Sequence, residues 1–189
     1  MFSFFVKEGE YDKWRDEVVF RLTAMVNEAK KYGVTPCHEN ESHIYGQYPE
    51  QVRDILTSVP ELAGIFDAAN YRMHNADTIE GINATFVNFA YMHIKDAIYE
   101  SQEIVPAGDG EGKIGEVIEM INEHTDGDVY LTLEPHLRLF GIYKSIDKKE
   151  LKSRYCFETA AEAFDFATNA LKALLAKLGY KEIDGKWIK

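Results

Sequence analysis

This chain of 189 residues has little cysteine and proline and no long apolar run. Its two cysteines are Cys37 and Cys156. No stretch approaches the roughly 20 apolar residues of a membrane helix, and no cationic segment followed by an apolar core opens the chain. We therefore expect a cytoplasmic protein without a disulfide or a membrane span. With five prolines and 46% hydrophobic residues, the composition indicates a packed core and not a disordered chain.

Basic residues are also scarce. The 21 lysines and arginines are outnumbered by 32 acidic residues, which gives a net charge of −11 and a pI near 5.0. Affinity for nucleic acids depends mainly on lysine and arginine side chains that neutralise phosphates. The charge balance therefore argues against a nucleic-acid partner, and we expect most of the acidic residues to form a solvated surface.

Four short apolar segments each end at or next to a side chain that binds metal ions well. The segments are residues 34–37, 63–66, 87–92 and 129–133, and the side chains are Glu39, Asp67, His93 and Glu134. Helix-like segments follow them, at intervals close to the roughly 30 residues of a strand-helix-strand unit. Alternating strands and helices predict a parallel sheet, whose carboxyl ends meet at one rim. We therefore expect the four side chains to converge.

The same periodicity predicts about five strands, each followed by a helix, within one domain over residues 1–189. In addition to the four segments above, the remaining strand of the five is expected at residues 2–6. Helices are expected for about 20 residues after Tyr11, from Pro49, from a cap at Asp77, around residues 114–121 and over residues 159–178. A complete eight-stranded α/β barrel typically needs about 250 residues. Periodicity leaves open whether the sheet is open or curled.

The two glutamates, the aspartate and the histidine form a donor set for a divalent ion. Mixed carboxylate and imidazole ligands suit Mn²⁺, Co²⁺, Zn²⁺ or Mg²⁺. Three negative charges leave room for a hydroxyl and a carbonyl oxygen of a substrate. In a ketose such an ion would stabilise an enediolate, and Glu39 and Glu134 are the candidate paired bases. In the alternative interpretation, each acid only caps the helix that follows its strand.

Several short motifs occur in a specific order along the chain. They are His38-Glu39-Asn40, Phe66-Asp67-Ala68-Ala69-Asn70-Tyr71, Met92-His93-Ile94-Lys95-Asp96-Ala97, Val105-Pro106-Ala107-Gly108-Asp109-Gly110-Glu111-Gly112 and Leu131-Thr132-Leu133-Glu134-Pro135-His136-Leu137. In this order they resemble the sugar phosphate isomerase/epimerase family of xylose isomerase-like TIM barrels. The resemblance begins at the fourth strand of the family barrel, so it implies a partial (β/α) TIM-type barrel that corresponds to strands four to eight.

The resemblance also implies functional residues. A divalent metal would be held by Glu39, Asp67, His93 and Glu134, and the two glutamates would also act as acid and base. Substrate contacts are implied for Asn70, Lys95 and His136. Each of these three has a simpler interpretation: a turn residue for Asn70, a surface ion pair with Asp96 for Lys95, and a hydrogen bond to a metal ligand for His136.

The chain departs from the family pattern in ways that leave the substrate open. Ketose 3-epimerases tend to have a histidine where Asn70 stands and an arginine in the loop after the metal-binding histidine. Here that loop is the glycine-rich segment 108–112, which has no arginine to grip a phosphate. We expect a small sugar or sugar phosphate as the substrate, and these departures leave its identity open. The usual proline is also replaced, by Ala68.

A partial barrel leaves strand edges and an apolar inner face without partners. The exposed edges are expected at residues 2–6 and 129–133. Unpaired edges and apolar faces favour association. We therefore expect a homo-oligomer that covers the open barrel face or the strand edges.

The sequence supports three functional hypotheses. The first is a divalent-metal-dependent sugar or sugar phosphate isomerase/epimerase. The second is an endonuclease-IV-like metallohydrolase, which would need more histidine ligands and a basic rim, and the net charge opposes it. The third is a non-catalytic half-barrel remnant that binds a partner. Binding of a divalent ion would separate the third hypothesis from the first two.

Overall fold

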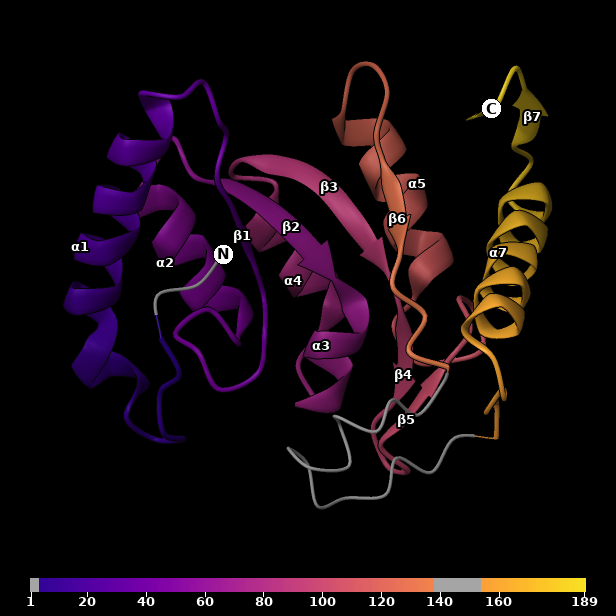
Figure 1. The fold of residues 1–189 in the computed structure, drawn as a ribbon, viewed down its shortest axis with the longest axis horizontal. Helices are drawn as coiled ribbons and strands as arrows, with labels where there is room; N and C mark the ends of the chain where they lie inside the picture. The colour runs from indigo at the N-terminus through magenta and orange to yellow at the C-terminus, as the bar shows by residue number, and fades with distance from the viewer. Residues whose placement is uncertain (1–3, 138–153) are drawn as a thin grey trace.

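A parallel sheet of four strands forms the centre of the structure, a computed structural model that describes residues 4–137 and 154–189 (Figure 1). The strands of this sheet are β1 (Cys37–Glu39), β2 (Ala63–Asp67), β3 (Phe89–Ile94) and β6 (Leu131–Leu133), in the order β1-β2-β3-β6. The helices are α1 (Tyr11–Lys30), α2 (Pro49–Ser58), α3 (Ala68–Met73), α4 (Thr78–Thr85), α5 (Ile114–His124) and α7 (Ala160–Lys177). The expected α/β class is therefore confirmed.

The helices begin and end where local sequence chemistry favours it. Asp77 caps α4, because its carboxylate accepts hydrogen bonds from the backbone N–H groups of Ile79 and Glu80 at 2.8 and 2.9 Å. At the start of α7, Thr159 and Glu162 form a reciprocal capping box. Pro49 is the first residue of α2. The five helices predicted from the sequence are confirmed by α1, α2, α4, α5 and α7.

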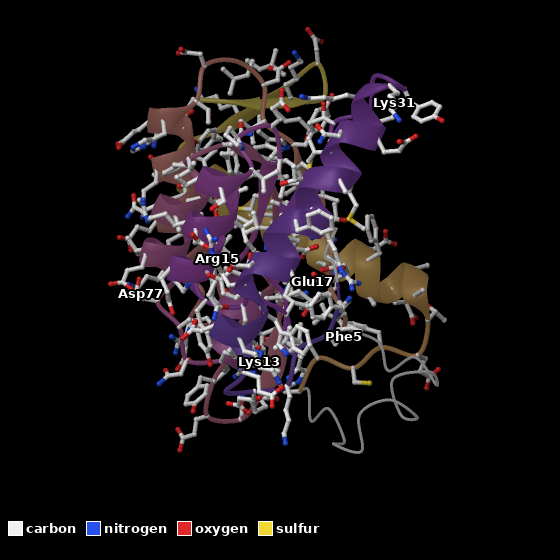
Figure 2. The ribbon with its side chains drawn as sticks, turned by 90° about the vertical axis from the view of Figure 1, so that its left-hand side faces the viewer. Phe5, Lys13, Arg15, Glu17, Lys31 and Asp77 are labelled. Atoms are coloured by element: carbon white, nitrogen blue, oxygen red, sulfur yellow. The ribbon has the colours of Figure 1, made fainter. Side chains whose placement is uncertain are left out.

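The helix α1 is held against α2 by a polar contact. Arg15 donates hydrogen bonds to both carboxylate oxygens of Asp54, at 2.8 and 2.7 Å, and to Ser58 at 2.7 Å. Figure 2 shows α1 running across this side of the molecule, with Arg15 directed towards α2. On the same inward side, α1 buries Val18, Leu22 and Val26 in the main core. Polar and apolar contacts together therefore hold α1 at one end of the sheet.

The two faces of the sheet have different environments. One face carries Phe66, Met92 and Ile94, which are buried among the helix side chains of the main hydrophobic core. In Figure 1, α4 and α5 lie behind the sheet on this side. The other face carries the alternate residues, including half-buried Tyr91 and exposed Thr132. A curved parallel sheet with helices on its outer face is the arrangement of a barrel wall.

Some elements differ from the sequence predictions. Residues 4–6 form no strand, and residues 2–3 lie outside the described residues, so the described parallel sheet has four strands and its edges are β1 and β6. The short helix α3 and the antiparallel hairpin of β4 (Asp96–Ile98) and β5 (Glu103–Val105) were not predicted. A second hairpin, of β7 (Lys181–Ile183) and β8 (Lys186–Ile188), forms the peripheral tail around Trp187.

Most of the connection between Glu134 and α7, residues 138–153, lies outside the described residues. Among the helices of the described segments, none is both long enough and apolar enough to span a bilayer.

Candidate metal centre

The four predicted metal-binding residues lie at the carboxyl ends of the four parallel strands. Glu39 and Asp67 are the last residues of β1 and β2, His93 is next to last in β3, and Glu134 directly follows β6. The register pairs Asp67 with His93 and His93 with Thr132. Because side chains alternate along a strand, all four then point to the same face of the sheet.

The donor atoms of these residues are close enough to share one ion. One atom from each of Glu39, Asp67, His93 and Glu134 lies within 4.8 Å of all the others. The Nδ1 atom of His93 is 2.9 Å from the Oε1 atom of Glu39 and 3.8 Å from the Oε2 atom of Glu134. Asp67 is fully buried, and the other three are partly buried. The hydrogen bond to Glu39 raises the pKa of His93 above its usual value, although burial opposes the shift.

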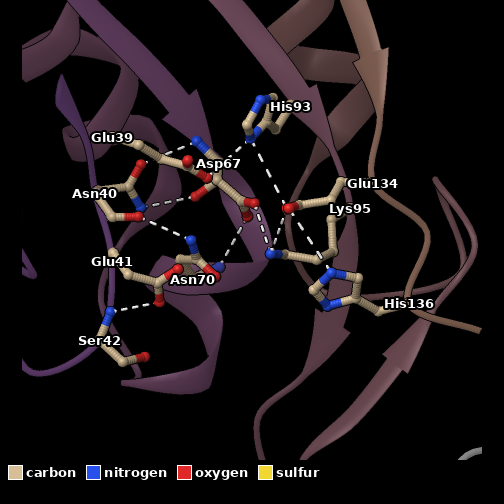
Figure 3. A network of polar contacts seen from close by, with 10 residues as sticks. All are labelled: Glu39, Asn40, Glu41, Ser42, Asp67, Asn70, His93, Lys95, Glu134 and His136. Carbon is tan, nitrogen blue, oxygen red and sulfur yellow. Dashed lines mark hydrogen bonds and ion pairs between the residues drawn. The ribbon is translucent and has the colours of Figure 1, made fainter. Parts of the chain in front are cut away.

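Lys95 lies inside this group, two residues after His93 on the same face of the sheet. Its Nζ atom is 2.9 Å from the Oδ2 atom of Asp67 and 2.9 Å from the Oε2 atom of Glu134 (Figure 3). The side chain is 5% exposed. Burial disfavours the charged ammonium, but the two carboxylates outweigh this effect and raise the pKa of Lys95. The alternative interpretation of Lys95 as a surface residue in an ion pair with Asp96 is therefore wrong.

Asp67 is held in place by its neighbours along the rim. Its Oδ1 atom accepts a hydrogen bond from the backbone N–H of Asn70 at 2.9 Å and so caps α3. The Asn40 side chain donates to the backbone oxygen of Asp67 at 2.8 Å and accepts from its N–H at 2.9 Å. One oxygen of Asp67 thus performs the capping role that the sequence allowed, and the other, Oδ2, lies 2.9 Å from the Nζ atom of Lys95. Burial raises the pKa of Asp67 to about 6 against the opposing effect of Lys95.

Asn70 and His136, predicted to contact substrate, lie next to this group. Asn70 is buried, and its side chain donates to the backbone oxygen of Asn40 at 2.8 Å, so it helps to tie β1 to α3. The Nε2 atom of His136 is 3.7 Å from the Oε1 atom of Glu134, which is too long for a hydrogen bond. Burial, together with the positive charge of Lys95, lowers the pKa of His136.

The glycine-rich loop after β5 is bound by a carboxylate of the chain itself. Asp96, fully buried, accepts hydrogen bonds from the backbone N–H groups of Gly108, Gly110, Gly112 and Ala97 at 2.8 to 3.1 Å. A Cβ atom at Gly110 or Gly112 would lie 2.3 or 2.7 Å from the Oδ1 atom of Asp96, which explains why the loop needs glycine there. These four amides are therefore engaged within the protein.

Comparison with solved structures identifies the fold. One match is the IolI protein with a bound zinc atom, at a TM-score of 0.68 and 16% identity over 93% of this chain and 61% of that protein. A D-tagatose 3-epimerase-like protein matches at a TM-score of 0.61 and 16% identity over 92% and 61% of the two chains. The 3-keto-D-glucoside 4-epimerase YcjR from E. coli matches at 0.57 and 14%, over 90% and 57%. This chain has the fold of the xylose isomerase-like barrels.

The chain spans about 60% of the length of these barrels. No protein-family model matches it, and no curated protein matches it by sequence. At such low identities the likeness establishes the fold, and the resemblance inferred from the motifs is confirmed at that level. On the barrel rim, the position of the four donor residues corresponds to the end of the strands where barrel enzymes place their active sites.

The rim residues fit a divalent ion. Two ligands on opposite sides of a small dication, each about 2.1 Å from it, lie about 4.2 Å apart. The 4.8 Å limit for the four donor atoms is close to that separation. Three carboxylates and one imidazole also match the borderline character of Mn²⁺, Co²⁺ or Zn²⁺.

Sequence reasoning missed two residues that build this rim. Asn40 follows Glu39 directly, and its amide clamps Asp67 across the two strands. Asp96 precedes the glycine-rich loop that it binds. Both are polar residues next to a predicted strand end, and a carboxylate that precedes a glycine-rich segment was the available clue to the second.

Proposed function

We propose that this chain is a divalent-metal-dependent isomerase or epimerase that acts on a sugar or sugar phosphate. The observation that carries the proposal is the convergence of Glu39, Asp67, His93 and Glu134 within 4.8 Å on one barrel rim. The structural likeness to a D-tagatose 3-epimerase-like protein, a 3-keto-D-glucoside 4-epimerase and a zinc-bound IolI protein supports it. Mn²⁺, Co²⁺, Zn²⁺ and Mg²⁺ are the candidate ions.

The reaction would be a proton transfer at the carbon next to a carbonyl group. When bound, a dication acts as a Lewis acid and makes this C–H more acidic. Glu39 and Glu134 come from the two edge strands of the described sheet and so flank the space between them. In our proposal one glutamate removes the proton, and the other returns a proton to the same or the adjacent carbon.

The other rim residues would bind and orient the substrate. Asn70 and His136 lie beside the donor group, and Lys95 lies within it. Donors and acceptors of these types suit the hydroxyl groups of a sugar. We propose that they contact substrate in addition to the hydrogen bonds and ion pairs that they form with the chain itself.

A substitution of the proposed base tests the function. Glu134→Gln keeps the size of the side chain but removes its ability to accept a proton, so we expect a loss of about 10²- to 10⁴-fold in proton exchange. The assay is deuterium uptake from D₂O into a panel of free and phosphorylated ketohexoses with Mn²⁺ present, followed by NMR. The matched control is Glu123→Gln, the same change at an exposed position of α5. Equal exchange rates in the Glu134→Gln and wild-type proteins would contradict the proposal.

A non-catalytic half-barrel is the second candidate, and the position of Lys95 favours it. An ammonium between Asp67 and Glu134 offsets part of their charge and so lowers the cost of burying these acids without any ion. Metal analysis distinguishes the two candidates. Bound metal in the purified protein, or a melting temperature that rises with added Mn²⁺, supports the metalloenzyme, and the absence of both supports the remnant.

The endonuclease-IV-like hypothesis receives less support. Within the described segments, the donor group contains one histidine, His93, which suits a single ion better than a multi-metal cluster. The net charge of −11 also opposes binding to a phosphate backbone. We therefore retain the proposal of no nucleic-acid partner. The proposals of a cytoplasmic location and of no membrane partner rest on the sequence analysis and are also retained.

We also propose that the chain forms a homo-oligomer. The edge strand β6 is preceded by Tyr130, which is 77% exposed, and carries the exposed Thr132 on the open face of the sheet. An unpaired edge and an exposed aromatic side chain favour association. Sedimentation equilibrium should show a dimer or larger species, and a monodisperse monomer would count against this proposal.

A further inference from the structure

Lys95 uses the same oxygen atoms that a metal ion would need. The Oδ2 atom of Asp67 and the Oε2 atom of Glu134 each lie 2.9 Å from its Nζ atom, and both residues belong to the four-residue donor group. Figure 3 shows the Lys95 side chain reaching between these two carboxylates from the position directly after β3. The ammonium is therefore a positive charge tethered within the candidate metal centre.

The negative charge of the donor group explains why the Lys95 ammonium lies within it. Glu39, Asp67 and Glu134 bring three negative charges close together, and Asp67 is fully buried. Buried carboxylates without a cation are costly, because burial disfavours the charged form. Lys95 supplies one positive charge between two of the three acids, which offsets part of their negative charge. The hydrogen bond from His93 reaches only the third, Glu39.

A dication and the ammonium cannot both approach these oxygens closely without strong repulsion, because the local dielectric constant is low. We propose that Lys95 is a resident cation that stabilises the metal-free site and must withdraw from Asp67 and Glu134 when a divalent ion binds, so that it limits the affinity for metal. This inference rests on the proposed metal centre. It assigns Lys95 a regulatory role in addition to the proposed substrate contact.

The test replaces the ammonium with an uncharged side chain of similar length. Lys95→Met keeps the apolar stem, and Lys172→Met, at an exposed ion pair with Glu182 on α7, is the matched control with the same loss of charge. Affinities for Mn²⁺ and Zn²⁺ are measured by isothermal titration calorimetry and competition with a chromophoric chelator. Melting temperatures are recorded with EDTA and with each metal.

We expect Lys95→Met to bind Mn²⁺ and Zn²⁺ at least about tenfold more tightly than the wild type, since the competing charge is gone. Without metal, the variant should melt at a lower temperature, and added metal should raise its melting temperature by more than in the wild type. The Lys172→Met control should match the wild type in all of these measurements.

Two results of these measurements would overturn the inference, and they differ in what they imply for the metal centre. An unchanged or weaker affinity in Lys95→Met, with clear binding by the wild type, removes the competitive role of Lys95 and leaves the metal centre intact. If neither protein binds metal, the metal centre and the inference fail together. The proposed isomerase activity is tested separately through Glu134→Gln.

If the Lys95→Met variant does not fold without metal, two further measurements still test the inference. Recovery of the folded Lys95→Met protein on refolding with Mn²⁺ would support the inference. In the wild-type protein, the rate at which an amine-reactive reagent labels Lys95, followed by mass spectrometry, should rise when Zn²⁺ is added, while the labelling of Lys172 stays constant. An unchanged rate at Lys95 under saturating Zn²⁺ would overturn the inference.

Discussion

The Asp96→Asn substitution tests how the rim loop is held. Asp96 is fully buried and accepts four backbone hydrogen bonds, two at each carboxylate oxygen. The Oδ1 atom binds the N–H groups of Ala97 and Gly112, and the Oδ2 atom binds those of Gly108 and Gly110. Asparagine offers one acceptor oxygen and one NH₂ group. In either orientation of the amide, two backbone N–H groups lose their acceptor. They then face the NH₂ group of asparagine, which is itself a donor.

The expected loss in the free energy of unfolding follows from these contacts. Hydrogen bonds to charged groups contribute about 1.5–3 kcal/mol each. Two such bonds are lost, but Gly108 is exposed and Gly110 is half-buried, so their amides can turn to water. Local opening of the loop also limits the cost to the free energy of that opening. We therefore expect the free energy of unfolding to fall by about 2–4 kcal/mol.

Urea denaturation followed by circular dichroism measures this change at constant m-value. Asp126→Asn, at an exposed position after α5, is the control with the same chemical change, and it should alter stability by less than about 0.5 kcal/mol. If the Asp96→Asn protein were as stable as the control protein, the four amides would not depend on this carboxylate, and our account of the glycine-rich loop would be refuted.

Other parts of the fold give further expectations. The hydrogen bonds from Arg15 lower the pKa of Asp54, so the carboxylate stabilises the fold above its unfolded pKa of about 3.9. This contribution is lost as the pH falls through the lower folded pKa, and the stability difference between wild type and Asp54→Asn should vanish in acid. Gly81→Ala would place a Cβ atom 2.3 Å from the ring of Tyr71 and should cost about 1–3 kcal/mol in thermal unfolding. Phe66→Ala, at a fully buried position of β2, should cost about 3–5 kcal/mol in urea titrations, and a loss below 1 kcal/mol would contradict the assigned core.

The substitutions that test stability and those that test the proposed metal centre change different residues. Replacing Asp96 or Asp54 leaves the four donor residues in place, because these residues are carried by β1, β2, β3 and the segment after β6. Replacing Lys95 or Glu134 changes the donor group itself. Variants of Asp96 and Asp54 therefore test the stability of the fold, and variants of Lys95 and Glu134 test the donor group.

Several local features were readable from the residues alone. The helical spacing of apolar side chains in α1 and α7 and the cap at Asp77 depend on neighbours within a few positions. The strand ends at Asp67 and His93 were likewise visible, because an apolar run followed by a polar side chain is a local pattern. Parallel strands then bring such ends to one rim, which is why the donor group could be predicted before its distances were known.

The tertiary structure decided the remaining features, because they depend on contacts between distant residues. The sequence suggested a surface partner for Lys95, but the strand register turns its side chain towards Asp67 and Glu134, 28 and 39 residues away. Likewise, Asp96 meets the amide of Gly112 only because a hairpin folds the chain back. A sequence pattern specifies which face of a strand a side chain occupies, and the packing of neighbouring strands and loops determines which charge or amide it meets there.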